Sequence, residues 1–509
     1  MKDFVDKHAD KIIGTLSCFD RVIVKGHLPF SHVAGMEAFL YSKNVLRKDF
    51  KTFVLPQAER LKAHAKQLAA SEGRSYEHHG SRMRKEQRAR AIARDQGINE
   101  GLVCVFSAVE PCRTFAVVPA KTRPRLISAN RKCLFLYFYF IHSKLGFCHV
   151  RIQTWFPFSI QVYFNGHDWL ARQMDQHGIR YRRLDNAFGW IEHPERAQQL
   201  ADQLPCDKWL SILHELARMV NPLLDELLKG FEYYWVIDQS EYATDIQFKD
   251  PKALESLYAR LLRHATLCFT AEDVLRFLGK RLTSLFTGEV LNDCKKRWPG
   301  ARVKHRMKEN WLKMYDKHGS VLRIETVINH PYDFKIRRMG KRNGQRVLGW
   351  YPMAKRVANL YRYAEVSRTS NQRYLNALAV VDDPAPAYRS LRRMAEPVRY
   401  RGRQVAGFNP AAESHVALFR AVLRGDHTIR GFRNGDVRKA LGLSSRNPEH
   451  RRRASAKVSR LLKRLHIHGQ IAKIPRSRRW RVTKMGYAFM SFAIRLHDEQ
   501  FAQGLAMAA

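Results

Sequence analysis

The chain has 509 residues, of which 45% are apolar, so it can form several globular cores of ordinary composition. Its 90 Lys and Arg against 47 Asp and Glu give a formal net charge of +43, which predicts a polyanionic partner. The longest apolar run covers residues 133–141, too short for a membrane-spanning helix of about 20 residues.

Targeting and redox signals favour a cytoplasmic protein without a membrane anchor. The first 14 residues lack the apolar segment of a signal peptide. The eight cysteines include no CxxC pair, which disfavours a zinc ribbon, and their apolar neighbours predict reduced core thiols. A merely basic protein is the alternative to nucleic-acid binding.

The first 200 residues predict a mixed α/β domain. Short apolar runs such as 21–25 and 102–106 indicate strands, and residues 81–95 indicate a basic helix. We expect this helix to contact nucleic acid through four basic side chains: Arg82, Arg84, Lys85 and Arg88. Residues 201–232 predict a helical connector.

Residues 233–380 predict an α+β domain that carries the candidate chemistry. Residues 242–248 are strand-like and 254–267 form an amphipathic helix. Residues 311–315 and 321–329 predict a hairpin whose turn, 316–319, ends on Gly319, a residue that is free to take positive φ. Residues 381–412 are rich in Pro, Gly and Arg and predict a linker. The fold class is therefore α+β and multidomain.

The segment 413–509 predicts a further domain. Helices are expected over 416–423, 434–441 and 454–468, with Asn434 as an N-cap and Gly469 as a C-cap, before strands at 471–474 and 480–482 and a helix from Thr483. Between residues 446 and 481, 13 Lys or Arg stand against one acid.

This segment resembles the winged helix-turn-helix domains of bacterial regulators and mobile-element proteins. The resemblance rests on "Leu-x-His-Gly-x-Ile", a basic turn and "Trp-Arg-Val-Thr". It implies a DNA- or RNA-binding surface and a homodimer as one possible assembly; a protein-interaction winged helix is the alternative. Expected contacts are Lys457, Arg460 and Arg464 on the third helix and Arg476, Arg478 and Arg479 on the wing.

Acids on apolar strands predict a magnesium site. Glu241 and Asp245 are four residues apart on one strand, and Glu325 lies inside another. Mg²⁺ prefers such oxygen ligands, and His305 is a further possible ligand. A structural salt bridge from Arg323 to Glu325 is the alternative.

Residues 312–326 (LKMYDKHGSVLRIET) resemble a short pattern of rolling-circle replication initiators of plasmids and filamentous phages. The resemblance implies that Tyr315 attacks a DNA phosphodiester while Lys317 stabilises charge. The paired-histidine strand of many such enzymes is missing, which leaves the attacking tyrosine open. The favoured interpretation of Tyr315 is an ordinary half-buried strand residue.

A second constellation contains Asp20, Arg21 and Glu110. Both acids are predicted at strand ends, where they could converge on one site, but capping of turns is the favoured interpretation.

The stretches CFDRV, SAVEPC, NGHDWLARQ, EYATDI and KMYDK together resemble an uncharacterised group of bacterial proteins found near mobile elements. This resemblance supplies no activity.

The charge, the C-terminal segment and the strand acids together lead to two hypotheses. One is a mobile-element nuclease or strand-transferase that uses Mg²⁺, and the other is a non-catalytic protein that acts as a regulator or in a ribonucleoprotein.

Overall fold

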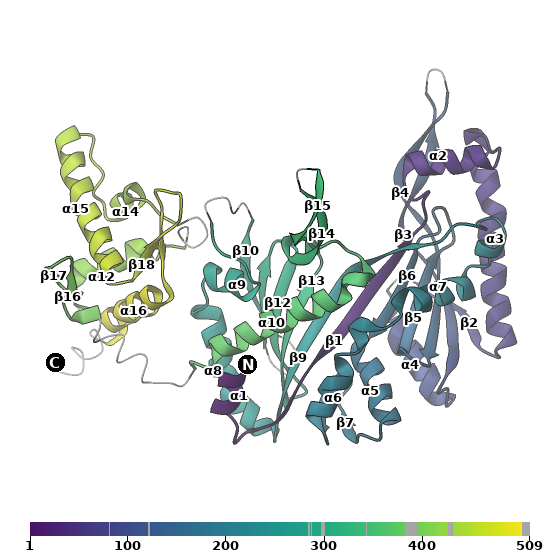
Figure 1. The fold of residues 1–509 in the computed structure, drawn as a ribbon, viewed down its shortest axis with the longest axis horizontal. Coiled ribbons are helices and arrows are strands. Elements are labelled where there is room, and N and C mark those ends of the chain that lie inside the picture. Colours follow the sequence, from purple (N-terminus) through teal and green to yellow (C-terminus); the bar gives the residue numbers. More distant parts are fainter. Residues whose placement is uncertain are drawn as a thin grey trace. The chain divides into compact units, whose positions relative to one another are not determined.

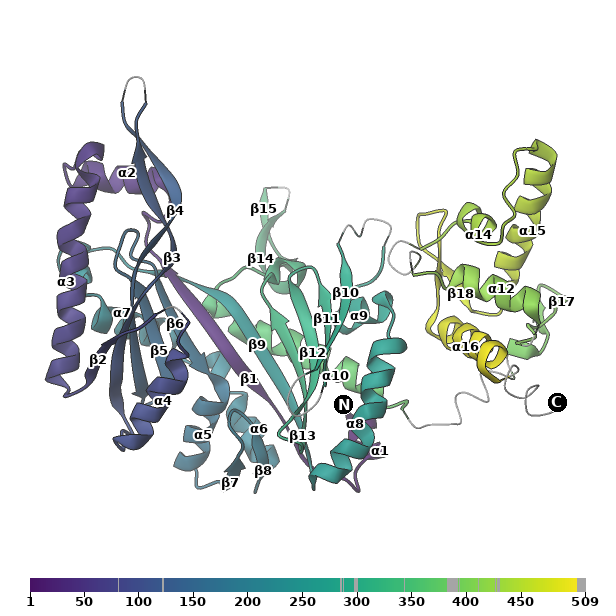
Figure 2. The same ribbon diagram turned by 180° about the vertical axis from the view of Figure 1, so that it is seen from behind.

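The computed structural model describes residues 1–500 except 81, 121–122, 284–285, 287, 297–300, 343, 382–391, 393, 411, 426 and 428–430. The chain forms two compact units. Figures 1 and 2 show its helices and strands from opposite sides. Unit 1 comprises Met1–Lys11, Asp250–Gly319 and Thr369–Ala509, and unit 2 comprises Ile12–Lys249 and Ser320–Arg368. Within the described residues, no helix is both long and apolar enough to cross a membrane.

Unit 2 is built on a large mixed sheet. Its strands, in sheet order, are β13 (Val321–Ile328), β9 (Tyr234–Phe248), β1 (Ile12–His27), β6 (Ile160–Asn165), β5 (Gly146–Gln153), β4 (Arg125–His142), β3 (Gly101–Val118) and β2 (Ser75–His78). Neighbouring strands pair antiparallel, except that β2 runs parallel to β3. The α+β class predicted from the sequence is confirmed.

Helices cover the sheet because strands such as β13 are buried on both faces. Every residue of β13 is buried, and a strand of that kind needs cover on each side. The helices of this unit are α2 (Val33–Ser42), α3 (Phe50–Ser71), α4 (Lys85–Asp95), α5 (Gly166–Gln176), α6 (Pro194–Ala201), α7 (Trp209–Val220) and the first half of α10 (Leu360–Leu378). Helices α5 and α6 pack on β1.

The structure divides the chain differently from the predicted boundaries. Strand β1 pairs with β6 on one side and with β9 on the other, so parts of the predicted domains 1–200 and 233–380 form one unit. Pairing between segments more than 200 residues apart leaves no local signal in sequence periodicity. The predicted connector contains α7.

Two hairpins of unit 2 lie outside the large sheet. Strands β7 (Tyr181–Arg183) and β8 (Phe188–Ile191) form one, and β14 (Lys335–Arg342) and β15 (Gln345–Pro352) form the other. Figure 1 shows β14 and β15 as an arm. We call this second hairpin the β-ribbon.

The parts of unit 1 before residue 369 are α1 (Lys2–Lys7), α8 (Pro251–Leu267), α9 (Ala271–Phe277), β10 (Val290–Lys296), β11 (Ala301–Met307) and β12 (Asn310–Lys317). The predicted turn after β12 is confirmed: His318 and Gly319 have φ of 56° and 78°, and the Gly319 amide donates to Asp316 Oδ1 at 2.9 Å.

The predicted linker 381–412 falls partly on residues outside those described. Its described part contains strands β16 (Val398–Tyr400) and β17 (Arg403–Val405), which pair with each other. The described part of this segment therefore contains a short hairpin that its Pro, Gly and Arg content did not indicate.

The C-terminal elements follow the predicted order. They are α12 (Glu413–Val422), α14 (Asn434–Ala440), α15 (Pro448–Ile467), β18 (Ile471–Lys473), β19 (Trp480–Val482) and α16 (Lys484–Arg495). Buried residues from these four helices form one core. Gly469 has the predicted positive φ of 70°, and Thr483 caps α16. The winged helix-turn-helix class itself stays a prediction.

Two predicted helix starts are wrong in detail. Helix α15 begins at Pro448 rather than 454, because the Asn447 side chain caps it by accepting from the amides of Glu449 and His450. The N-cap of α14 is Arg433, and Asn434 is already helical; its side-chain amide donates to α15 instead.

Candidate metal centre

Three adjacent strands bring three carboxylates to one face of the sheet. Glu325 on β13 pairs with Ala243 of β9, and Val327 pairs with Glu241, so the two glutamates are diagonal neighbours on the same face. On β1 the register passes from Phe19–Tyr242 to Val22–Ser240. This β-bulge places Asp20 and Arg21 together opposite Glu241.

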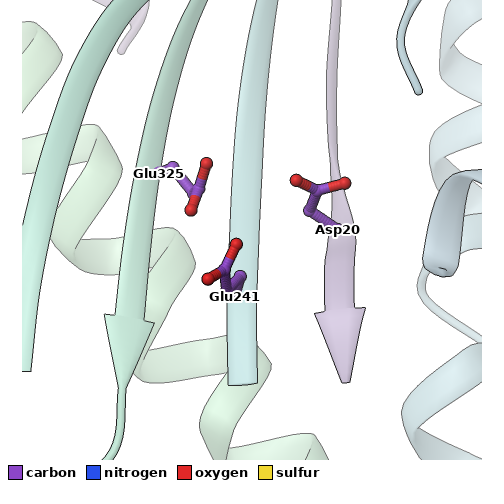
Figure 3. A group of neighbouring side chains, drawn as sticks. All are labelled: Asp20, Glu241 and Glu325. Atoms are coloured by element: carbon purple, nitrogen blue, oxygen red, sulfur yellow. The ribbon is translucent and has the colours of Figure 1, made fainter. Parts of the chain in front are cut away.

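Asp20, Glu241 and Glu325, which we call the acidic triad, each offer a carboxylate oxygen within 4.8 Å of the other two. Figure 3 shows the three side chains on neighbouring strands. Their exposed fractions are 6%, 7% and 1%. Negative charges buried this close repel one another, and a divalent cation with oxygen ligands would turn the repulsion into coordination.

Asp20 is held in place by three donors. Its Oδ1 accepts from the side-chain amides of Asn165 at 3.2 Å and Asn186 at 2.7 Å, and its Oδ2 accepts from Arg323 Nη1 at 3.3 Å. The carboxylate orientation is thus fixed by the start of α5, the loop before β8 and strand β13.

Asp245 has a different role from the predicted metal ligand. Arg323 donates Nε to its Oδ1 and Nη2 to its Oδ2, so both carboxylate oxygens are bound by one guanidinium. Burial alone would raise the pKa of Asp245, but the Arg323 charge and hydrogen bonds lower that pKa to about 2. Asp245 therefore supports the site, and Asp20 is the third member of the group that a metal could join.

His167 completes this buried support. Its ring lies between Asp20 and Asp245, with Nδ1 at 3.4 Å from Asp20 Oδ1 and Nε2 at 3.5 Å from Asp245 Oδ2. Its Nε2 also lies 3.1 Å from Arg323 Nη2 and 3.4 Å from Cys18 Sγ. Burial and the charge of Arg323 lower the pKa of His167, but Cys18, Asp20 and Asp245 together raise it well above its ordinary value.

A cavity of about 360 Å³ lies next to side chains that bind Asp20 of the triad. Asn165 and Asn186, which bind Asp20, line it together with Arg21, Tyr163, Arg90 and Arg183. Burial would lower the pKa of Arg21, yet the charges of Glu241, Tyr163, Asp20 and Glu325 raise it overall. A permanent cation therefore stands next to the acids at the edge of a space open to a ligand.

Sequence reasoning placed Asp20 with Glu110, and the structure separates that pair. Glu110 lies inside β3, not at a strand end, and accepts from Lys85 at 3.0 Å, Arg151 at 2.7 Å and Tyr137 at 2.7 Å. Asp20 lies inside β1 as a member of the triad, which replaces the predicted turn cap. The bulge that redirects Asp20 has no signal in residue type alone.

The other predicted catalytic residues belong to unit 1. His305 on β11 is buried, and its ring nitrogens lie 2.8 Å from Asn292 Oδ1 and 2.9 Å from Tyr374 Oη. Burial lowers its pKa to about 4. Both nitrogens are thus used in a structural network, which replaces the predicted ligand role. Tyr315 and Lys317 lie on β12 and are buried.

The predicted basic helix keeps only part of its expected surface. Arg82 and Arg84 are exposed before α4 begins. Lys85 is buried and ion-paired with Glu110, and Arg88 pairs with Glu77 at 3.1 Å. Lys85 is therefore a structural residue, because its charge neutralises an acid of the sheet.

The C-terminal basic residues divide into exposed and tethered sets. Lys457, Arg460, Arg476 and Arg478 reach solvent, as predicted. The prediction that Arg464 faces a groove is wrong. Its Nε donates to Ala406 O at 2.9 Å, and its guanidinium lies 4.2 Å from the centre of the Phe408 ring.

Arg479 is also partly engaged within the same module. It is half-buried, and its Nη1 donates to Gly431 O at 3.0 Å. The exposed part of the predicted wing surface is therefore smaller than the arginine count indicates.

The residues of the candidate site that sequence reasoning missed are Asn165, His167 and Asn186, together with the membership of Asp20 in the triad. Only the position of Asp20 in a strand-like segment gave any signal. Comparisons of the chain with protein-family models, curated proteins and solved structures found no match, so the candidate site stands on its geometry.

Proposed function

We propose that this protein is a nucleic-acid-binding enzyme that cleaves or transfers phosphodiester bonds with a divalent cation, Mg²⁺ in the first instance, held by Asp20, Glu241 and Glu325. The observation that carries the proposal is the acidic triad, with three buried carboxylates converging within 4.8 Å and a cavity, which Arg21 lines, next to side chains that bind Asp20.

The donor set suits a hard cation. Three carboxylates give an all-oxygen set, which favours Mg²⁺ or Mn²⁺ over zinc. Such a cation would polarise a phosphate oxygen and lower the pKa of a bound water. Arg21 is placed to contact a substrate phosphate, while Asn165, Asn186 and Arg323 keep Asp20 oriented.

The charge of the chain supports nucleic acid as the substrate class. A formal charge of +43 favours a polyanion. Lys457, Arg460, Arg476 and Arg478 of the C-terminal module add a surface for phosphates. The triad lies in unit 2 and these residues in unit 1, so binding and cleavage can be tested separately.

Water is the first candidate nucleophile. Tyr315 is only 5% exposed, and a buried phenol must become accessible before it can attack a phosphodiester. A tyrosine that forms a covalent adduct, as the resemblance to rolling-circle initiators implies, is the second candidate. The mobile-element setting likewise stays a prediction.

The test is incubation of the purified protein with labelled single-stranded DNA, duplex DNA and RNA, with Mg²⁺ or with EDTA. We expect Mg²⁺-dependent products that disappear in Asp20→Asn, Glu241→Gln and Glu325→Gln. The matched control is Asp238→Asn, because Asp238 also lies on β9 but pairs with Lys25 at 2.9 Å.

Two results would reject this function. Cleavage that survives all three triad substitutions would point to a contaminating nuclease. Tight binding without cleavage on any substrate would favour the alternative, a non-catalytic regulator or ribonucleoprotein component. A labelled adduct lost in Tyr315→Phe would replace water by Tyr315 as the nucleophile.

A further inference from the structure

The β-ribbon presents one exposed face with a distinctive composition. Its register pairs Arg337 with Trp350, Met339 with Leu348 and Lys341 with Arg346. Because alternate residues of paired strands share a face, these six side chains lie together. All six are exposed, with Trp350 at 57%.

The opposite face holds the ribbon together. Tyr351 lies across it, with its hydroxyl 3.1 Å from Gly340 O and 3.0 Å from Val347 O, two acceptors for its single proton. A Cβ at Gly340 would overlap the Tyr351 ring, so glycine there lets the ring cover the backbone. Arg338 lies on this face, 5.0 Å from the Tyr351 ring centre.

The base of the ribbon is fixed to α10. Arg362 donates Nε to Lys335 O at 2.8 Å, and its guanidinium lies 5.1 Å from the Trp350 ring centre. The indole is therefore positioned by a cation while more than half of the residue faces solvent. A large exposed aromatic that is held in place is suited to stacking.

The charge of this segment is of one sign. From Lys335 to Arg356 the chain contains eight Lys or Arg and no Asp or Glu. On the exposed face, Arg337, Lys341 and Arg346 surround the apolar pair Met339 and Leu348. A surface that binds single strands combines cations, which contact phosphates, with aromatic and apolar side chains, which contact bases. This face of the β-ribbon has both.

We infer that the exposed face of the β-ribbon binds single-stranded nucleic acid, with Trp350 stacked on an unpaired base and Arg337, Lys341 and Arg346 on the backbone. A single strand fits better than a duplex because only an unpaired base offers its face to the indole. Strand β13, which carries Glu325, leads into β14 through residues 329–334, so the ribbon and the triad belong to one unit.

The experiment measures the affinity of the full chain for fluorescein-labelled oligonucleotides, single-stranded and duplex, in EDTA. Trp350→Ala is expected to weaken single-strand binding about 5- to 150-fold, the range for the loss of one stacked base. Trp350→Phe, which keeps a ring, should restore most of the affinity.

The matched charge variants are Arg337→Gln and Arg338→Gln, which remove the same charge from opposite faces. We expect Arg337→Gln to reduce the slope of log affinity against log salt by about 0.7, the value for one single-strand phosphate contact, and Arg338→Gln to leave that slope unchanged. Equal effects of the two variants would overturn the inference, as would wild-type affinity in Trp350→Ala or binding to duplex alone.

The inference shares with the proposed function only the class of ligand. The assay contains no metal, so loss of cleavage in the triad variants does not affect it. The two hypotheses therefore fail in different experiments. If the β-ribbon does not bind single strands, Trp350→Ala has wild-type affinity. If the triad holds no catalytic metal, the wild-type protein gives no Mg²⁺-dependent products.

Discussion

Arg323 and Asp245 form a bidentate ion pair in the interior of unit 2, with Nε–Oδ1 and Nη2–Oδ2 distances of 2.6 and 2.7 Å and essentially no exposed surface on either side chain. The pair lies on the strands that also carry Glu325 and Glu241. Its geometry connects the stability of the sheet to the position of the acidic triad, because Arg323 also donates to Asp20.

Removal of one partner should be strongly destabilising. Arg323→Met leaves Asp245 as a buried charge without its guanidinium, which costs about 3–5 kcal/mol in comparable pairs. The double variant Arg323→Met with Asp245→Leu should regain a large part of that loss. Thermal unfolding of the three proteins checks this, and a double variant no more stable than Arg323→Met would contradict it.

Metal binding should stabilise the folded protein. A cation that binds only the folded triad raises the melting temperature with its concentration, as mass action requires. We expect Mn²⁺ or Mg²⁺ to raise the melting temperature of the wild-type protein and of Asp238→Asn, but not that of Glu325→Gln. An equal rise in Glu325→Gln would place the bound metal elsewhere.

Acid should weaken unit 1 through His305. Burial lowers the folded-state pKa of His305 to about 4, below the ordinary 6.5, so the unfolded chain binds the extra proton between these values. Stability should therefore fall as pH decreases from about 6.5 to about 4. His305→Gln, which retains a polar side chain, should flatten this part of the profile in melting experiments.

The C-terminal module offers a pair of contrasting variants. Lys457→Gln with Arg460→Gln removes two exposed charges, so it should weaken nucleic-acid binding in a salt-dependent manner and leave the melting temperature unchanged. Arg464→Gln should lower the melting temperature, because its guanidinium binds the backbone at Ala406 and contacts Phe408. Filter binding and calorimetry separate the two effects.

The β-ribbon should depend on the space over Gly340. In Gly340→Ala the new Cβ would displace the Tyr351 ring, whereas in Gly349→Ala the nearest ring atom is at 3.3 Å. We expect Gly340→Ala to expose the segment 335–352 to protease and to weaken single-strand binding, with little change in Gly349→Ala. Identical digestion patterns of Gly340→Ala and the wild-type protein would show that the Tyr351 ring does not stabilise the β-ribbon.

Local patterns predicted local structure well. The apolar runs, the turn at Gly319 and the helices and strands of residues 413–495 were all identifiable, because each depends on neighbours within a few residues. Glu241 and Glu325 were identifiable as acids on apolar strands.

Partnerships across the chain were not predictable from these patterns. In the sequence, Asp245 and Glu241 are both acids on the same apolar strand. Only the pairing of β13 with β9 shows that the Asp245 carboxylate is bound by Arg323. Asp20 reaches the site through a bulge in β1, and a bulge is set by the partner strand. Arg464 and Lys85 have the composition of surface residues but acquire partners from distant segments.

The acidic triad draws its members from positions 20, 241 and 325, on strands that are adjacent only after the sheet is complete. During synthesis, a nascent chain shorter than about 325 residues lacks the third carboxylate, and domains fold as units once their segments have emerged. The site therefore comes into existence late. An active nuclease of this design would be inert throughout most of its own translation, when the messenger RNA and ribosomal RNA are nearest to it.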